Sequence, residues 1–125
     1  MNVQLLPAAL EDIAVLRAAG YRGTGFLLGT EMGRLVLVER LLPLEIDPRR
    51  DRGAACAAAF QHYGERLLGA FFCRRRPRAL EWLAGDLVLA VSARQLQAFS
   101  CELDARTQRP RLAPLLEDAE ATWPS

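Results

Sequence analysis

The feature that most constrains the fold is a set of short runs that are apolar on successive residues. The run at 67–73 (LLGAFFC) is one, and the run at 86–92 (DLVLAVS) is another. A strand that is apolar on both faces needs cover on both, so these runs predict a sheet with other elements packed on more than one side. Hydrophobic residues make up 51% of the 125, which is enough for one such core. We therefore predict a single α/β domain over 1–125, with its core at about 5–103 and an acidic tail at 116–125.

Helical spacing and turn residues place the remaining elements. Apolar residues at near-helical spacing, with Pro7 at the start and Gly20 at the end, predict a helix over 7–19. The segment 29–33, bounded by glycines, predicts a hairpin between antiparallel strands at 24–29 and 34–42. We further expect a polar loop at 43–53, a helix at 54–63 closed by Gly64, a strand at 67–73, a short helix at 78–84, strands at 86–92 and 95–103, and a turn at 107–110. The order α-β-β-α-β-α-β-β predicts a mixed β-sheet flanked by helices.

The charged residues are ordinary in number but not in kind. All sixteen basic residues are arginine, and the formal net charge is +1. The absence of lysine indicates GC-rich coding and hence a bacterial source, so an arginine is not by itself evidence of a chemical role. The near balance of charge disfavours nucleic-acid binding.

Targeting and redox signals point to the cytoplasm. No basic segment followed by an apolar stretch opens the chain, so we expect no signal peptide. No apolar run approaches the roughly 18 residues of a membrane span. The three cysteines, Cys56, Cys73 and Cys101, are widely spaced and include no Cys-x-x-Cys pair. That pattern argues against a disulfide framework or a thiolate zinc site and fits a reducing compartment.

The element order and three local strings resemble the JAB/MPN domain, the family of zinc-dependent JAMM isopeptidases and their inactive relatives. The helix from Pro7 leads into GFLLG at 25–29, which is similar to the family's first glycine-bounded strand. LGAFF at 68–72 is similar to the strand that delivers the His-x-His-Pro motif, and DLVLAV at 86–91 to the aspartate region. The resemblance covers about 5–103 and implies a cytidine-deaminase-like layering of sheet and helices.

The resemblance also implies where a metalloprotease site would lie. The family's general-base glutamate, seven residues before Gly29, corresponds to Arg22. Its two zinc-binding histidines correspond to Phe72 and Arg74, and with one inserted residue its aspartate corresponds to Asp86. These positions therefore make up a degenerate site in which the carboxylate of Asp86 alone would survive.

Such a site could not hold a catalytic zinc ion, which needs about three protein ligands and an open position for water. The chain has one histidine, His62, on the helix predicted at 54–63 and away from the motif. Phenylalanine cannot ligate a metal, and arginine stays protonated and repels a dication. We therefore expect no metal, no cofactor and no catalytic residues of the JAMM kind.

The run of Arg74, Arg75, Arg76 and Arg78 leaves two interpretations open. Guanidinium groups suit phosphate, nucleic acid or an acidic partner surface, but a solvated loop offset by nearby acids such as Glu81 is the favoured interpretation. Trp82 falls where the family's groove would lie, either as a binding anchor or as apolar filling of a dismantled metal site.

Cys73 lies between an apolar run and these arginines. Cations lower the pKa of a nearby thiol, so an exposed Cys73 could act as a nucleophile, with His62 as the one candidate base. The simpler interpretation is a small apolar residue at the end of a core strand.

Three hypotheses about function follow. The leading one is a non-catalytic JAB/MPN-like protein-interaction or scaffold module. The resemblance implies that its partner is a second copy or another protein, such as a ubiquitin-like or sulfur-carrier protein. The apolar face at 54–60 is a candidate pairing surface, and a buried helix is equally consistent with it. The alternatives are a metal-independent hydrolase built around Cys73 or a carboxylate such as Asp86, and an anion-binding regulator that uses the arginine run at 74–78.

Overall fold

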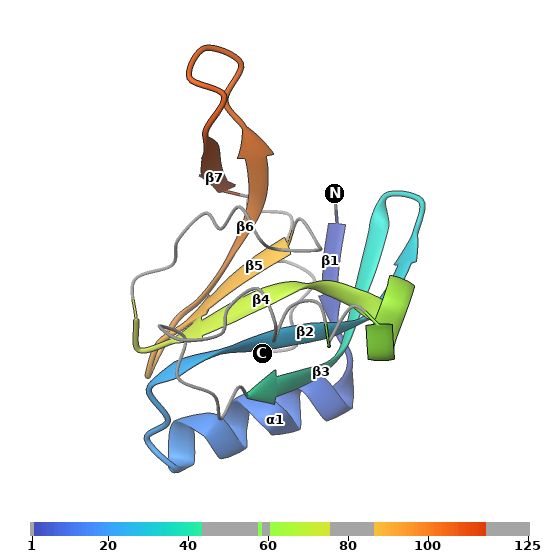
Figure 1. The fold of residues 1–125 in the computed structure, drawn as a ribbon. Coiled ribbons are helices and arrows are strands. Elements are labelled where there is room, and N and C mark those ends of the chain that lie inside the picture. Colours follow the sequence, from blue (N-terminus) through green and yellow to red (C-terminus); the bar gives the residue numbers. More distant parts are fainter. Residues whose placement is uncertain (1, 44–57, 59–60, 76–86, 115–125) are drawn as a thin grey trace.

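The computed structural model describes residues 2–43, 58, 61–75 and 87–114, which form one curled sheet with a helix along one face (Figure 1). The elements, in chain order, are β1 (Asn2–Leu5), α1 (Pro7–Ala18), β2 (Gly23–Met32), β3 (Leu35–Pro43), the 3₁₀ turn η1 (Gly64–Arg66), β4 (Leu67–Cys73), β5 (Leu87–Val91), β6 (Leu96–Leu103) and β7 (Pro110–Pro114). The sheet order is β1-β3-β2-β4-β5-β6-β7. The protein is thus a mixed α/β structure, as the apolar runs predict.

The sheet mixes parallel and antiparallel pairs. β1 runs parallel to β3, and β4 runs parallel to β5. β2 is antiparallel to both of its neighbours, β3 and β4, and β6 is antiparallel to β5 and β7. The long strand β2 therefore joins the N-terminal part of the sheet to the part formed by β4–β7.

The helix α1 forms where the sequence predicts it. Pro7 occupies its first turn, where the missing N–H costs no hydrogen bond, and Gly20 follows its end with φ +66°. Ala9, Ile13 and Leu16 are buried at helical spacing against the sheet. In the part of the chain that the structure describes, no helix is long and apolar enough to cross a membrane.

Strand β4 is buried along its whole length, as predicted from its unbroken apolar run. Phe71 and Cys73 belong to the core between α1 and the sheet. Ala70 and Phe72 belong to a second cluster on the opposite face, together with Val88 of β5. The bounds of β4 match the predicted strand at 67–73 residue for residue.

Two strands were missed by the sequence prediction, so the predicted order α-β-β-α-β-α-β-β is incomplete. Strand β1 precedes the helix, and β7 follows β6 through the turn at 104–109. The predicted hairpin turn at 29–33 is also wrong, because β2 continues to Met32 and the turn lies at Gly33 and Arg34. At Gly29 the strand instead carries an irregularity in its pairing with β3.

Several predicted elements lie outside the described residues or are described only in part. Of the predicted helix at 54–63, residue 58 and residues 61–63 are described and are helical. The loop at 43–53 is described only at Pro43, which belongs to β3. The short helix at 78–84, Asp86 and the tail at 116–125 lie outside the described residues.

The strand β7 forms one edge of the sheet and projects with β6 from the rest of the molecule (Figure 1). The Asp104 N–H donates to the Arg109 carbonyl at 2.9 Å, so these two residues form a hydrogen-bonded pair. From this pair on, hydrogen-bonded and non-hydrogen-bonded residue pairs alternate along β6 and β7. The backbone groups of Pro110, Leu112 and Pro114 therefore face the open edge. Because proline has no N–H, this edge offers one donor in three residues, which disfavours pairing with another strand.

Candidate functional site

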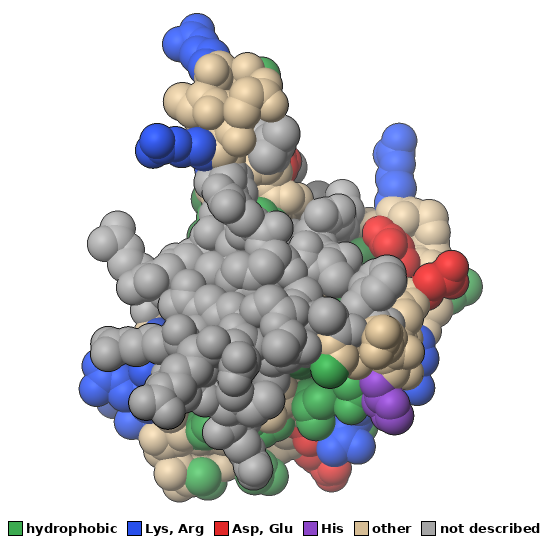
Figure 2. Space-filling view, in the orientation of Figure 1, with side chains coloured by type: hydrophobic (Ala, Val, Ile, Leu, Met, Phe, Trp, Pro, Cys, Tyr) green, Lys and Arg blue, Asp and Glu red, His purple; other side chains and the backbone are tan. Residues whose placement is uncertain are grey.

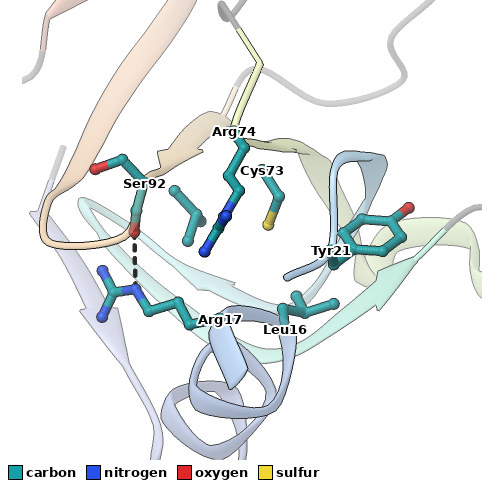
Figure 3. A pocket seen from close by; sticks show the side chains of 7 residues that line it. Leu16, Arg17, Tyr21, Cys73, Arg74 and Ser92 are labelled. Carbon is teal, nitrogen blue, oxygen red and sulfur yellow. Dashed lines mark hydrogen bonds between the residues drawn. The ribbon is translucent and has the colours of Figure 1, made fainter. Parts of the chain in front are cut away.

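A shallow hollow lies at the end of the sheet where β2 begins and β4 ends. There Gly23 pairs with Cys73, and Cys73 pairs in turn with Val91 of β5. The C-terminal turn of α1 passes over the same end. The hollow is open to solvent and is lined by Leu16, Arg17, Tyr21, Cys73, Arg74, Val91 and Ser92 (Figure 3).

Arg17, on the last turn of α1, ties the helix to the turn between β5 and β6. Its Nε donates to the Ser92 carbonyl at 2.9 Å, and its Nη2 donates to the Gln95 carbonyl at 3.2 Å. The turn is itself closed, because the Ser92 N–H donates to the Gln95 carbonyl at 3.0 Å and the Gln95 N–H donates to Ser92 Oγ at 2.9 Å. The guanidinium of Arg17 is therefore held against the turn between β5 and β6, beside the hollow (Figure 3).

The opposite wall is fixed by Tyr21 and Thr24. The Tyr21 hydroxyl donates to the Thr24 carbonyl at 2.8 Å, and the buried Thr24 hydroxyl donates to the Phe71 carbonyl at 2.8 Å. The rings of Tyr21 and Phe71 also pack at a tilt, with centroids 6.5 Å apart. These contacts lock the start of β2 against the end of β4.

Arg74 enters the hollow because the chain leaves the strand at this residue. Its φ is +53°, in the left-handed region that residues with a side chain seldom adopt, and its N–H donates to the Val91 carbonyl at 2.9 Å. Its side chain points across the hollow toward α1 (Figure 3). Phe72, two residues earlier, is buried on the other face of the sheet.

The structure thus brings together some of the positions that the family resemblance singles out. Arg22 is exposed and directly precedes Gly23, so it lies at the same sheet end as Arg74. Phe72 does not line the hollow that Arg74 lines. Asp86 lies outside the described residues.

Cys73 is a core residue at the floor of the hollow. Its side chain is 2% exposed, and its thiol is free. Burial raises the pKa of this thiol from 9.0 to about 11, and the charges of Arg17 and Arg74 offset only part of that rise. The thiol is therefore protonated at neutral pH, which matches the interpretation of Cys73 as the end of a core strand.

The other predicted site residues lie elsewhere or are not described. Arg75 is exposed beside Arg74, whereas Arg76, Arg78 and Trp82 lie outside the described residues. His62 is exposed and packs edge-on against Tyr63, with ring centroids 4.7 Å apart. Within the described ranges, no three His, Cys, Asp or Glu side chains form a group that could hold a metal ion.

Arg17, Tyr21 and Ser92 are site residues that the sequence did not reveal. Arg17 is 75 residues from Ser92, and no local motif signals a contact at that separation. The one available signal was the predicted end of the helix at 19, which leaves Arg17 in the last turn, where a cation is favoured.

Comparisons with known proteins identify no family for this chain. No protein-family model matches the chain, and no curated protein matches it.

Proposed function

We propose that the chain is a non-catalytic protein-interaction module built on a JAB/MPN-like framework, a pseudoenzyme of the zinc isopeptidase family. The observation that supports this most directly is the Gly23–Cys73 pair, which places Arg22 and Arg74 at one end of the sheet. By resemblance these two positions belong to a general base and a zinc ligand. The two positions are 52 residues apart in the sequence and come from separate motifs, whereas Phe72, the other position that the resemblance gives to a zinc ligand, is buried on the opposite face of the sheet.

The side chains at these positions cannot perform the chemistry of the family. A guanidinium remains protonated at any physiological pH, so it neither accepts a proton from water nor binds Zn²⁺. Two such cations at one sheet end raise the electrostatic cost of bringing a dication there. In the proposed module this end is a binding surface for negatively charged groups.

The proposed partner is a protein with an acidic contact surface. Family resemblance points to a ubiquitin-like or sulfur-carrier protein, or to a second copy of the chain, in the cytoplasm. The charges of Arg22, Arg74 and Arg75 would steer such a partner to this end of the sheet, because complementary charge raises the association rate. Steered association of this kind weakens with rising salt.

The burial of Cys73 argues against the alternative of a metal-independent hydrolase. A nucleophilic thiol must be accessible and at least partly ionised, whereas this one is covered and its pKa lies near 11. The chain's one histidine, His62, packs on Tyr63 and is not among the residues of the hollow.

The proposal is tested by titrating the full chain with a ubiquitin-like or sulfur-carrier protein in a calorimeter. We expect binding that the double variant Arg22→Glu with Arg74→Glu weakens at least about tenfold, since like charges then face the partner. Arg34→Glu is the matched control, because Arg34 is an exposed arginine at the far hairpin turn.

The same mixture also tests the absence of catalysis. A carrier protein with a fluorogenic amide at its C-terminus should stay intact with or without added zinc. Hydrolysis that a chelator abolishes would overturn the non-catalytic assignment. Failure of every carrier protein to bind would overturn the partner class.

A further inference from the structure

We infer that the hairpin of β6 and β7 is a nucleic-acid-binding arm whose tip enters the major groove of duplex DNA. The arm is the part of this hairpin that projects from the sheet, from the paired residues Glu102 and Arg111 to the turn at 104–109 (Figure 1). It lies at the end of β6 away from the hollow, because β6 starts at Leu96, which pairs with Val91 of the hollow. The inference rests on the shape and the side chains of the arm and does not depend on the JAB/MPN resemblance.

The base of the arm is anchored in the fold. Cys101 of β6 and Leu112 of β7 are cross-strand partners, and both pack against the buried cluster that contains Phe72. Glu102 and Arg111 form the next pair along the ladder, so their side chains lie on the opposite face of the ribbon. There Arg111 Nη2 lies 3.6 Å from Glu102 Oε2. The arm is therefore a fixed extension of the sheet.

The turn at the tip of the arm is held in one conformation by its own hydrogen bonds. Asp104 Oδ1 accepts the N–H groups of Arg106 at 2.8 Å and Thr107 at 3.3 Å, and these bonds lower the pKa of the Asp104 carboxyl. Gln108 has a left-handed φ of +57°, and its Nε2 donates to the Ala105 carbonyl at 3.3 Å. The tip is thus shaped before any ligand arrives, which lowers the entropy cost of binding.

The tip presents cationic and polar side chains to solvent. Arg106, Thr107, Gln108 and Arg109 are all exposed, and Figure 2 shows arginine side chains extending from the arm at the top of the view. Arginine, threonine and glutamine are side chains that contact phosphate oxygens and base edges in DNA complexes. Interfaces between proteins depend on large buried anchors such as tryptophan and tyrosine as well as arginine, and the segment 104–109 (DARTQR) has no aromatic or large aliphatic residue. The side chains of the tip therefore favour a nucleic acid over a protein.

The shape of the arm favours duplex DNA among nucleic acids. A two-stranded β-ribbon fits the major groove of B-form DNA, which is about 12 Å wide. The major groove of A-form RNA is deep and narrow, so side chains of such a ribbon do not reach its bases. The prolines at 110 and 114 leave the outer edge of β7 with few donors, which keeps the arm two strands wide.

The charge of the arm predicts how strongly it binds. The segment 102–111 contains three arginines and two carboxylates, a formal net charge of 3 − 2 = +1. One carboxylate lies beside Arg111 and the other is bonded within the turn, which leaves Arg106 and Arg109 for two phosphates. Each neutralised phosphate contributes about −0.9 to the slope of log K against log salt, so we expect a slope of about −2. Binding is therefore weak and confined to low salt, in keeping with the chain's net charge of +1.

The inference is tested by NMR titration of the full ¹⁵N-labelled chain at low salt. The probes are a mixed-sequence DNA duplex about two helical turns long, an RNA duplex of the same sequence, and poly-glutamate as a stand-in for an acidic protein surface. We expect saturable shifts of the signals of 102–111 with the DNA duplex. The RNA duplex should bind at least about fivefold more weakly, because its major groove does not admit the arm.

Two double variants show whether the arm itself binds. Arg106→Gln with Arg109→Gln removes both charges and keeps the hydrogen bonds that Asp104 accepts from backbone N–H groups. It should weaken DNA binding at least about tenfold at low salt and remove most of the salt dependence. Arg34→Gln with Arg94→Gln changes the net charge equally, at exposed arginines in two other turns, and should alter binding less than about twofold.

Four results would overturn the inference. They are shifts that do not saturate or that spread over the whole surface, equal losses in the two double variants, binding of the RNA duplex as tight as that of the DNA duplex, and binding of poly-glutamate to the arm as tight as that of DNA. The last result would assign the arm to an acidic protein partner instead.

Discussion

The folded chain should become less stable as the pH rises above about 9, and the variant Cys73→Ala should lose much less stability over the same range. Burial raises the pKa of this thiol to about 11 in the folded chain, against 9.0 when it is exposed. Below about pH 9 the thiol is protonated in both states, so it adds no pH dependence. Between about pH 9 and pH 11 the unfolded chain releases the proton and the folded chain keeps it, so rising pH favours unfolding.

The size of the effect follows from the shift. A shift of two pKa units lowers the free energy of unfolding by about 2.7 kcal/mol in total. About 2 kcal/mol of this decrease has occurred by roughly pH 10.5. At neutral pH the variant should be less stable by about 1 kcal/mol, because the sulfur atom leaves a small cavity in the core. The stability difference between the two proteins should therefore change sign as the pH rises above about 9.5.

The assay is urea unfolding of both proteins, followed by circular dichroism from pH 8 to pH 10.5 under reducing conditions. Contributions from tyrosines, arginines and the other thiols occur in both proteins and cancel in the difference. Alkylation at pH 8 gives a second readout, with Cys73 in the folded chain modified about a hundredfold more slowly than in urea. A stability difference that stays constant over this pH range would show that the thiol is not held protonated by burial.

Three further predictions concern the framework of the site, each measured by urea unfolding or hydrogen exchange. Phe71→Ala should cost about 3–5 kcal/mol, because the ring is 0% exposed in the core. Gly69→Ala should destabilise the fold by upwards of about 3 kcal/mol, because the new Cβ would lie 1.8 Å from the Leu87 carbonyl oxygen. The control Gly33→Ala should destabilise it by only about 1–2 kcal/mol, because nothing lies within 4 Å of the new Cβ. Arg17→Gln should speed amide exchange in the turn at 92–95 without unfolding the chain, and unchanged exchange there would show that its two hydrogen bonds do not hold the turn.

The buried centre of the fold could be predicted because its signal is local. The unbroken apolar run at 67–73 matches β4, since a strand covered on both faces has no polar alternation to interrupt it. Pro7, Gly20 and the apolar spacing between them likewise fixed α1. The beginning and the end of each of these two elements are marked by neighbouring residues in the sequence.

The edges of the sheet could not be predicted in the same way. Strand β1 has only four residues, in which Val3 and Leu5 are buried, and so short an alternation is no clear signal. Strand β7 contains Pro110 and Pro114, which count against a strand unless the open edge is known. The hairpin prediction failed at Gly29 because that glycine is needed for close packing, with the Leu37 carbonyl where a Cβ would be.

Only some of the residues at this end of the sheet could be singled out from the sequence. An anion site was one interpretation of the arginine run, and the family resemblance assigned Arg22 and Arg74 to one site. The contribution of Arg17 depends on a contact between residues 75 positions apart, and the direction of Arg74 depends on one left-handed backbone angle. Neither property has a local sequence signature.

The central proposal, a binding module that resembles zinc isopeptidases but holds no zinc, is tested most directly by measuring zinc per chain. The purified chain is dialysed against excess Zn²⁺ at neutral pH, the free ion is removed, and the metal per chain is measured. We expect far less than one zinc ion per chain, because Arg22 and Arg74 stand at the positions that the resemblance gives to the general base and to a zinc ligand, and neither side chain binds zinc. One tightly held zinc ion per chain, lost on treatment with a chelator together with an isopeptidase activity, would contradict it.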